Sequence, residues 1–307
     1  MKKFIHFFFI VILLSGCDDT SQIIDIPDTV LKKMLVSKYD YNNDNEISEK
    51  EASKVRELDV SGTPVKNNEI TSMKGIEHFI NLRILKCSYN RLITLDISKN
   101  LKLKELSCFD NTLTNLDVSN NINLKKLSCN RNIIPKLDVS KNVLLETLFC
   151  YTNQLTELDV TNNTKLKYFS CSFNMIEELD VSKNLRLSKF FCNDNKLTIL
   201  DVSNNKDLLK FVCYNNMLSV LDVRNNPVLL LLDCHGNQLS EIDVSKNIEL
   251  NEFSCSQNKI TQIDVSNNLR LYRFLCRNIP ELKTIFLKKD QEIREFGKNS
   301  QTQVIYK

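Results

Sequence analysis

The sequence predicts a β-rich solenoid, a rod built from stacked chain turns of equal length. Ten cysteines recur at a constant interval of 21 residues, from Cys87 to Cys276. The motif LxxLxCxxNxLxxLDVSxNxx surrounds them, with nine full copies between Leu82 and Arg270 and a tenth that decays after losing its asparagine at Ile279. No insertion interrupts the interval, so every turn should have the same size and pack mainly against its neighbours.

Each turn should contain two short extended segments, LxC and LDV, because apolar and polar positions alternate in both. The whole chain has only five glycines. We therefore expect asparagine, which tolerates left-handed geometry, to form the bends. Nine to ten turns at the spacing of parallel strands give a rod about 45 Å long.

Two columns of asparagine recur with the same interval. A buried bend leaves backbone N–H and C=O groups unpaired, and a side-chain amide carries both donors and acceptors. Both columns are interpreted as structural. The first column is Asn90, Asn111, Asn132, Asn153, Asn174, Asn195, Asn216, Asn237 and Asn258. The second is Asn100, Asn121, Asn142, Asn163, Asn184, Asn205, Asn226, Asn247 and Asn268.

The cysteine column is predicted to consist of free thiols that fill the core, because cysteine behaves as a small buried hydrophobe. Neighbouring turns would bring the Cα atoms within disulfide range. In-register Cβ atoms point in parallel, however, which suits a bridge badly. Partial bridging stays open as an alternative, and metal binding or catalysis is disfavoured.

The N-terminus has the features of a bacterial lipoprotein signal. Lys2 and Lys3 precede an apolar run that is too short to span a membrane as a mature helix. Leu14-Ser15-Gly16-Cys17 resembles the lipobox, which implies cleavage before Cys17 and lipid attachment to its thiol. An ordinary secretory signal is the alternative. We expect a lipid-anchored protein of the bacterial envelope, on the outer membrane or cell surface in preference to the inner membrane.

Residues 40–51, DYNNDNEISEKE, resemble an EF-hand calcium loop. Calcium takes six to eight hard oxygen ligands, which this spacing would bring together. Asn45 stands where the loop usually has glycine, and asparagine is the next best residue for that turn. The predicted calcium ligands are Asp40, Asn42, Asp44, Glu46 through its carbonyl, Ser48 and Glu51.

The segments beside this loop fit two helices. Pro27 and Asp28 could open the first, and Ser48 with Glu51 forms a capping box for the second. The alternative is a polar turn without metal. Because the sequence contains only one such loop, calcium binding would be weak and would stiffen the start of the solenoid rather than signal.

The chain is divided as follows: a signal peptide at 1–16 before the lipidated Cys17, a linker at 18–26, an EF-hand-like segment at 27–58, an N-terminal cap at 59–81, the repeats at 82–285 and a C-terminal cap at 286–307. A solenoid requires caps because its end turns would otherwise expose the core.

The CSxNxLTxLDVSxN turns, the GIEHFINL cap and the calcium-type loop together resemble bacterial surface leucine-rich repeat lipoproteins, especially those of the Bacteroidetes, and more distantly the internalins. The resemblance covers nearly the whole mature chain. It implies a leucine-rich repeat fold and extracellular recognition of a protein or glycan, for example in adhesion. It implies no reaction.

Outward positions of the first half-repeat vary in identity, which suits a specific binding surface on the concave face. Exposed aromatic clusters usually mark an interface. The predicted partner-binding residues are Phe149, Tyr151, Tyr168, Phe173, Phe191 and Tyr214. The alternative is that Phe149 and Phe191 only cover the strands or pack against a cap.

The second half-repeat places an aspartate outward in every turn, from Asp96 to Asp264. The Asp-Val-Ser spacing suits a bond from each carboxylate to the backbone two residues on, which would offset their mutual repulsion. Divalent cations on this column are the alternative. The uniformity argues against specific recognition there.

The predicted function is non-enzymatic binding by a monomer, and a structural spacer without a specific ligand is the first alternative. An enzyme is disfavoured because His6, His78 and His235 are the only histidines and none sits in a catalytic pattern. The formal charge of +3 falls to about +1 without Lys2 and Lys3, so no nucleic-acid partner is expected.

Overall fold

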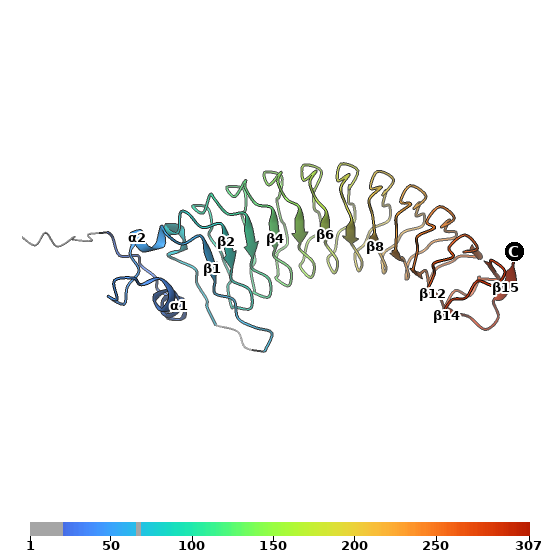
Figure 1. The fold of residues 1–307 in the computed structure, drawn as a ribbon, viewed down its shortest axis with the longest axis horizontal. Helices are drawn as coiled ribbons and strands as arrows, with labels where there is room; N and C mark the ends of the chain where they lie inside the picture. Colours follow the sequence, from blue (N-terminus) through green and yellow to red (C-terminus); the bar gives the residue numbers. More distant parts are fainter. Residues whose placement is uncertain (1–20, 66–68) are drawn as a thin grey trace, which may run out of the picture.

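The chain folds into a single arch of stacked turns, with a small helical unit at one end and the C-terminus at the other (Figure 1). A computed structural model describes residues 21–65 and 69–307. The predicted β-rich solenoid with 21-residue turns is confirmed. The signal peptide at 1–16 and the lipidation of Cys17 lie outside the described residues.

A long sheet runs along the arch and a short sheet lies in the C-terminal turns, and all strand pairs within them are parallel. The helices are α1 (Thr29–Tyr39), α2 (Glu49–Ala52) and the 3-10 turn η1 (Ile76–His78). The long sheet contains β1 (Glu57–Asp59), β2 (Ile84–Lys86), β3 (Glu105–Ser107), β4 (Lys126–Ser128), β5 (Thr147–Phe149), β6 (Tyr168–Ser170), β7 (Lys189–Phe191), β8 (Lys210–Val212), β9 (Leu231–Asp233), β10 (Glu252–Ser254), β12 (Arg273–Cys276) and β14 (Glu295–Lys298). The short sheet contains β11 (Gln262–Asp264), β13 (Thr284–Leu287) and β15 (Gln303–Tyr306).

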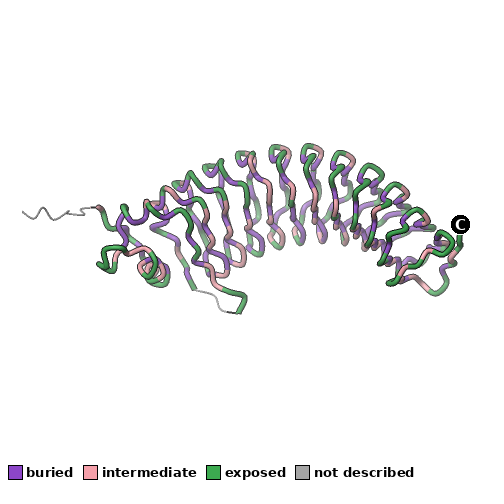
Figure 2. Tube along the Cα trace, viewed as in Figure 1, coloured by how far each residue is buried: buried purple, intermediate pink, exposed green. Residues whose placement is uncertain are grey.

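Strand register follows the repeat, so equivalent residues of successive turns lie side by side. The middle residue of each strand points into the core, as Leu106 and Leu127 do. In the middle of the arch this column changes to phenylalanine, and the rings of Phe169, Phe190 and Phe211 stack with centroids 5.4 and 5.5 Å apart. Figure 2 shows the buried residues running continuously along the interior.

Most of the LDV segments, predicted to be extended, do not pair as strands. Residues Leu95–Ile97 and the equivalent residues of the following turns form no strand pairs until β11, which pairs with β13. Their apolar residues are nevertheless buried, as Val118 and Val139 are. Side-chain packing and the second asparagine column therefore hold this side of the turn.

The expectation that asparagine itself adopts the left-handed bends is wrong for most turns. Positive φ falls two residues after each cysteine, immediately before the first asparagine column. These residues are Tyr89, Asp110, Arg131, Thr152, Phe173, Asp194, Asn215, Gly236, Gln257 and Asn278, with φ between 50° and 64°. Non-glycine residues are uncommon in this region, so the following asparagine must compensate through hydrogen bonds.

Asn195 shows how the first column does so. Its Nδ2 donates to the carbonyls of Cys171 and Cys192 at 3.0 and 3.1 Å, and its Oδ1 accepts the Ile176 N–H at 3.0 Å. The side-chain amide thus replaces the backbone pairing that the bend removes. The predicted structural role of this column is confirmed.

The helical unit closes the first edge of the long sheet. The Tyr39 hydroxyl donates to the Glu57 carbonyl at 3.0 Å, and Lys38 Nζ donates to the Asp59 carbonyl at 2.9 Å. Both carbonyls belong to β1, the edge strand. Unpaired strand edges favour aggregation, so α1 contributes to the N-terminal cap together with the segment at 59–81.

The C-terminal cap continues the second amide column with a substitute. Gln291 Nε2 donates to the carbonyls of Val265 and Asn268, the acceptors that the next asparagine of the second column would use. Asn299 accepts the Asn278 N–H and donates to the Ile279 carbonyl, contacts that differ from those of the first column. With β1 and β14 added by the caps, the long sheet has twelve strands rather than nine or ten.

Candidate functional site

The outward side chains of the long sheet and of the turns that follow its strands form one surface, here called the sheet face. It carries all six predicted aromatic residues. Tyr168 is 39% exposed and Phe173 is 49% exposed, while Phe149, Tyr151, Phe191 and Tyr214 are partly buried.

The structure brings some of these residues together and separates others. Phe149 and Phe191 flank Ser170 in one row across β5, β6 and β7. Tyr168 lies on the middle strand, and Lys189 Nζ makes a cation–π contact with its ring, 5.1 Å from the ring centroid. Phe173 stands in the turn after β6, at a residue with φ of 54°. We call Phe149, Tyr151, Tyr168, Phe173 and Phe191 the aromatic cluster.

Tyr214 belongs to a different part of the sheet face. Its ring stacks on the His235 imidazole with centroids 4.3 Å apart. His235 Nδ1 in turn lies 2.7 Å from Asp233 Oδ1. Tyr214 is thus directed toward the C-terminal turns.

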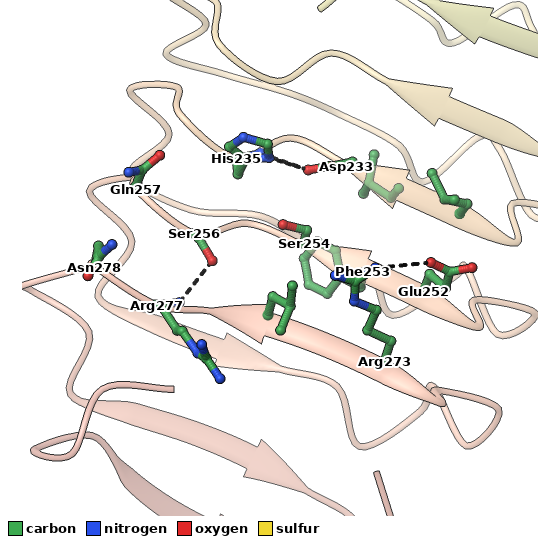
Figure 3. A pocket seen from close by; sticks show the side chains of 13 residues that line it. Asp233, His235, Glu252, Phe253, Ser254, Ser256, Gln257, Arg273, Arg277 and Asn278 are labelled. Carbon is green, nitrogen blue, oxygen red and sulfur yellow. Dashed lines mark hydrogen bonds and ion pairs between the residues drawn. The ribbon is translucent and has the colours of Figure 1, made fainter. Parts of the chain in front are cut away.

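Sequence reasoning missed a hollow of about 360 Å³ on the sheet face over β9, β10 and β12 (Figure 3). Asp233 and His235 line one side of it, and Leu275 and Arg277 line another. Aligning the outward positions turn by turn would have placed Ser254 and Ser256 between these larger residues. We call this hollow the C-terminal pocket.

The calcium-type loop has the backbone that its sequence predicts. Asn43 and Asn45 have positive φ values of 62° and 65°, so Asn45 does adopt the left-handed turn expected at the glycine position. Asp40 organises the loop by accepting the N–H groups of Asn43 and Asn45 at 2.7 and 2.9 Å. Asp44 accepts the Glu46 N–H at 2.8 Å.

Glu51 closes the loop from its far end. Its carboxylate accepts the Tyr41 N–H at 2.7 Å and the Ser48 N–H at 2.9 Å, which completes the predicted capping box of α2. Burial alone would raise the pKa of Glu51, but these hydrogen bonds outweigh it and hold the pKa below its ordinary value.

The donor set of this loop fits a hard cation, because it consists of carboxylate, amide, hydroxyl and carbonyl oxygens. Within residues 21–65 and 69–307, however, no three His, Cys, Asp or Glu side chains converge as a metal site. The Glu46 carboxylate pairs with Lys32 Nζ at 2.7 Å, so only its carbonyl is left for the predicted role of ligand. Bidentate binding by Glu51 therefore requires its side chain to turn from the backbone groups toward the loop.

A short antiparallel bridge supports the loop where a second calcium loop would usually pair. Ile23 pairs with Ser48, and the Ile24 N–H donates to the Ile47 carbonyl at 2.8 Å. The segment before α1 thus supplies the strand that a partner loop would provide. These backbone contacts support the single predicted loop from within the same chain.

The cysteine column and the aspartate column both have the predicted structural roles. The ten repeat cysteines are free and fully buried, and burial raises the pKa of the Cys87 and Cys129 thiols to about 12. Each aspartate from Asp96 to Asp264 accepts the N–H two residues on, at 2.7–3.0 Å. The buried thiols are out of reach of a ligand, whereas the aspartates remain exposed.

The fold is similar to solved bacterial structures. The functional domain of InlJ from Listeria monocytogenes, which includes a cysteine ladder, is 34% identical, with a TM-score of 0.73 over 84% of this chain and 66% of that chain. The internalin InlF from Listeria monocytogenes is 21% identical, with a TM-score of 0.65 over 91% of this chain and 95% of that chain. A leucine-rich repeat protein of Leptospira interrogans is 20% identical, with a TM-score of 0.61 over 78% of this chain and 74% of that chain.

The protein is a leucine-rich repeat protein. Within this class it is internalin-like, and its cysteine column corresponds in kind to the ladder of InlJ, of which this chain spans just under two thirds. No protein-family model and no curated protein matches the chain. No helix in the described part of the chain is long and apolar enough to cross a membrane.

Proposed function

We propose that this protein is a non-enzymatic, lipid-anchored component of the bacterial envelope that binds a protein or glycan partner through its sheet face. The observation that carries the proposal is the aromatic cluster. Its side chains remain partly or largely exposed on adjacent turns, and both caps lie elsewhere. Aromatic side chains dominate the energetics of interfaces.

Calcium binding at residues 40–51 forms the second part of the proposal. Asp40, Asn42 and Asp44 would hold the ion with Ser48, Glu51 and the Glu46 carbonyl, and the ion would supply positive charge to a loop rich in oxygen. Because α1 contacts β1, ordering this loop would stabilise the first edge of the solenoid. The lipid on Cys17 would tether the protein beside this end.

The binding proposal is tested with residues 18–307, since one continuous core runs from Ile24 to Leu287. Immobilised protein is exposed to solubilised surface proteins and to envelope glycans, and a bound partner is then measured by titration. Replacing Phe149, Tyr151 and Tyr168 with serine should reduce its affinity at least tenfold with nearly unchanged thermal stability.

The matched control replaces Ile122 and Leu185 with serine. These side chains are 56% and 57% exposed but lie in the turns that precede the strands. If both variants lose the partner equally, the aromatic cluster is not the binding surface. A protein that captures nothing would favour the structural-spacer alternative. Lipid attachment is tested separately by labelling with a fatty-acid analogue, which Cys17→Ala should abolish.

A further inference from the structure

The C-terminal pocket arises from a local change in side-chain size. Ser254 pairs across the sheet with Asp233 on one side and Leu275 on the other. Ser256 occupies the equivalent position two residues on, between His235 and Arg277. Two small residues between four larger ones leave a depression about two strand spacings, or ~10 Å, wide.

Every charged side chain of this pocket except one has a hydrogen-bonding or ionic partner. Asp233 contacts His235 at 2.7 Å. Arg273 contacts Glu252 at 3.8 Å and Glu295 at 3.2 Å. Among the described residues, by contrast, no carboxylate lies within ion-pair distance of the Arg277 guanidinium. The pocket therefore presents one cation whose charge is not neutralised by a direct partner.

The backbone of Arg277 is held in place beside the pocket. Its backbone N–H donates to Ser256 Oγ at 2.9 Å, and the two residues are drawn together in Figure 3. Its side chain lies over β14 at Gly297, where a Cβ atom would come within 2.5 Å of Arg277 Nε. Glycine at 297 thus makes room for the guanidinium beside the pocket. A positioned guanidinium binds carboxylates through two parallel N–H donors.

We propose that the C-terminal pocket binds the terminal carboxylate of a polypeptide partner, with Arg277 as the residue that holds it. The inference rests on the proposed binding function and specifies the ligand chemistry. Leu231 and Leu275, both partly exposed and in the pocket wall, provide apolar contact for the last side chain of that partner.

A polypeptide fits this pocket better than an acidic sugar does. Sugar rings are usually held by an open aromatic face together with several unpaired polar groups. Here one face of His235 is covered by Tyr214, and Phe253 is 1% exposed. The accessible apolar wall is aliphatic, which suits an amino-acid side chain.

The test uses hexapeptides that are coupled to beads through their N-terminal amine and whose last two residues are randomised among Ala, Val, Leu and Phe, made with C-terminal free acids and with C-terminal amides on separate beads. Residues 18–307 should be retained at least tenfold more by the acid beads. Arg277→Gln should remove this difference, and Arg277→Lys should restore it only in part, because lysine lacks the planar fork. The matched control is Arg131→Gln, which removes an arginine from the same face that is already paired with Asp110.

Equal retention by acid and amide beads, retention by neither, or a difference that survives Arg277→Gln would overturn the proposal. Beads carrying galacturonic acid, or peptides with an internal Asp and an amidated end, test the other sources of carboxylate; preference for either of them over the free-acid peptides would also overturn it. Thermal melting of each variant excludes misfolding. Partner capture through the aromatic cluster is measured separately, so its failure is distinguishable from failure at Arg277.

Discussion

The Tyr214 ring stacks on the His235 imidazole, with centroids 4.3 Å apart and an angle of 13° between the two ring planes. His235 is also bound to Asp233, so Tyr214 forms the outer layer of a three-residue wall beside the C-terminal pocket. Sequence reasoning placed Tyr214 with the aromatic cluster because it considered residue type and turn number only. Its ring stacks on His235, a lining residue of the pocket, which associates it with the pocket instead.

Removing this stack should weaken peptide binding at the C-terminal pocket without affecting the aromatic cluster. Stacked aromatic pairs contribute about 0.5–1.5 kcal/mol beyond burial, so Tyr214→Ala should lower retention on free-acid beads roughly two- to tenfold, assuming that this energy holds His235 in place. Tyr214→Phe keeps the ring and should bind normally. A loss of the same size in Tyr214→Phe would show that the hydroxyl, rather than the stack, matters.

The two asparagine columns should differ in their contribution to stability. Asn195 donates to carbonyls and also accepts the Ile176 N–H, whereas Asn205 donates to Val181 and Asn184 while its Oδ1 has no partner. Asn195→Leu therefore leaves the Ile176 N–H without a hydrogen-bond acceptor, and Asn205→Leu leaves no backbone N–H in that state. We expect Asn195→Leu to cost about 1–3 kcal/mol more, measured by urea unfolding. Equal losses would mean that backbone pairing is not the role of the Oδ1 atom in the first column.

The sequence was sufficient for the fold because one motif determines every turn. Periodicity revealed which residues point inward, and chemistry indicated why amides must recur. The sequence was insufficient where the motif ends, since Gln291 continues the second column from a position out of register with the repeat. The C-terminal pocket was also invisible, because it depends on differences between neighbouring turns, such as Ser256 beside Arg277.

Calcium should raise the melting temperature of the ectodomain if residues 40–51 bind it. The expected increase is a few degrees at millimolar calcium, because a ligand stabilises the folded state by RT ln(1 + [L]/Kd) and weak single sites have Kd values of about 10⁻⁴–10⁻³ M. Glu51→Gln can still cap α2 but lacks the carboxylate, so it should abolish the response. Glu49→Gln, which changes a neighbouring exposed acid, is the control. Identical calorimetric titrations for wild type and Glu51→Gln would contradict the site.

The cysteine column should make the fold unstable at high pH. Burial raises the pKa of Cys87 and Cys129 from 9.0 to about 12, so the folded state favours the protonated thiol. This stabilisation is complete below the pKa of the unfolded thiol, and it declines from pH 9 upward until the folded thiols also ionise near pH 12. Each thiol contributes about 1.4 kcal/mol per pH unit across that window.

Replacing Cys150, Cys171 and Cys192 with valine tests this relationship. Valine keeps the core apolar but does not titrate, so the fall of unfolding free energy above pH 9 should be shallower by about 4 kcal/mol per pH unit. Urea unfolding at closely spaced pH values from 8.5 upward, over the range in which both proteins are folded, measures the slope, and comparison with wild type cancels the contributions of lysine and tyrosine. Parallel slopes for the two proteins would show that the buried thiols do not control alkaline stability.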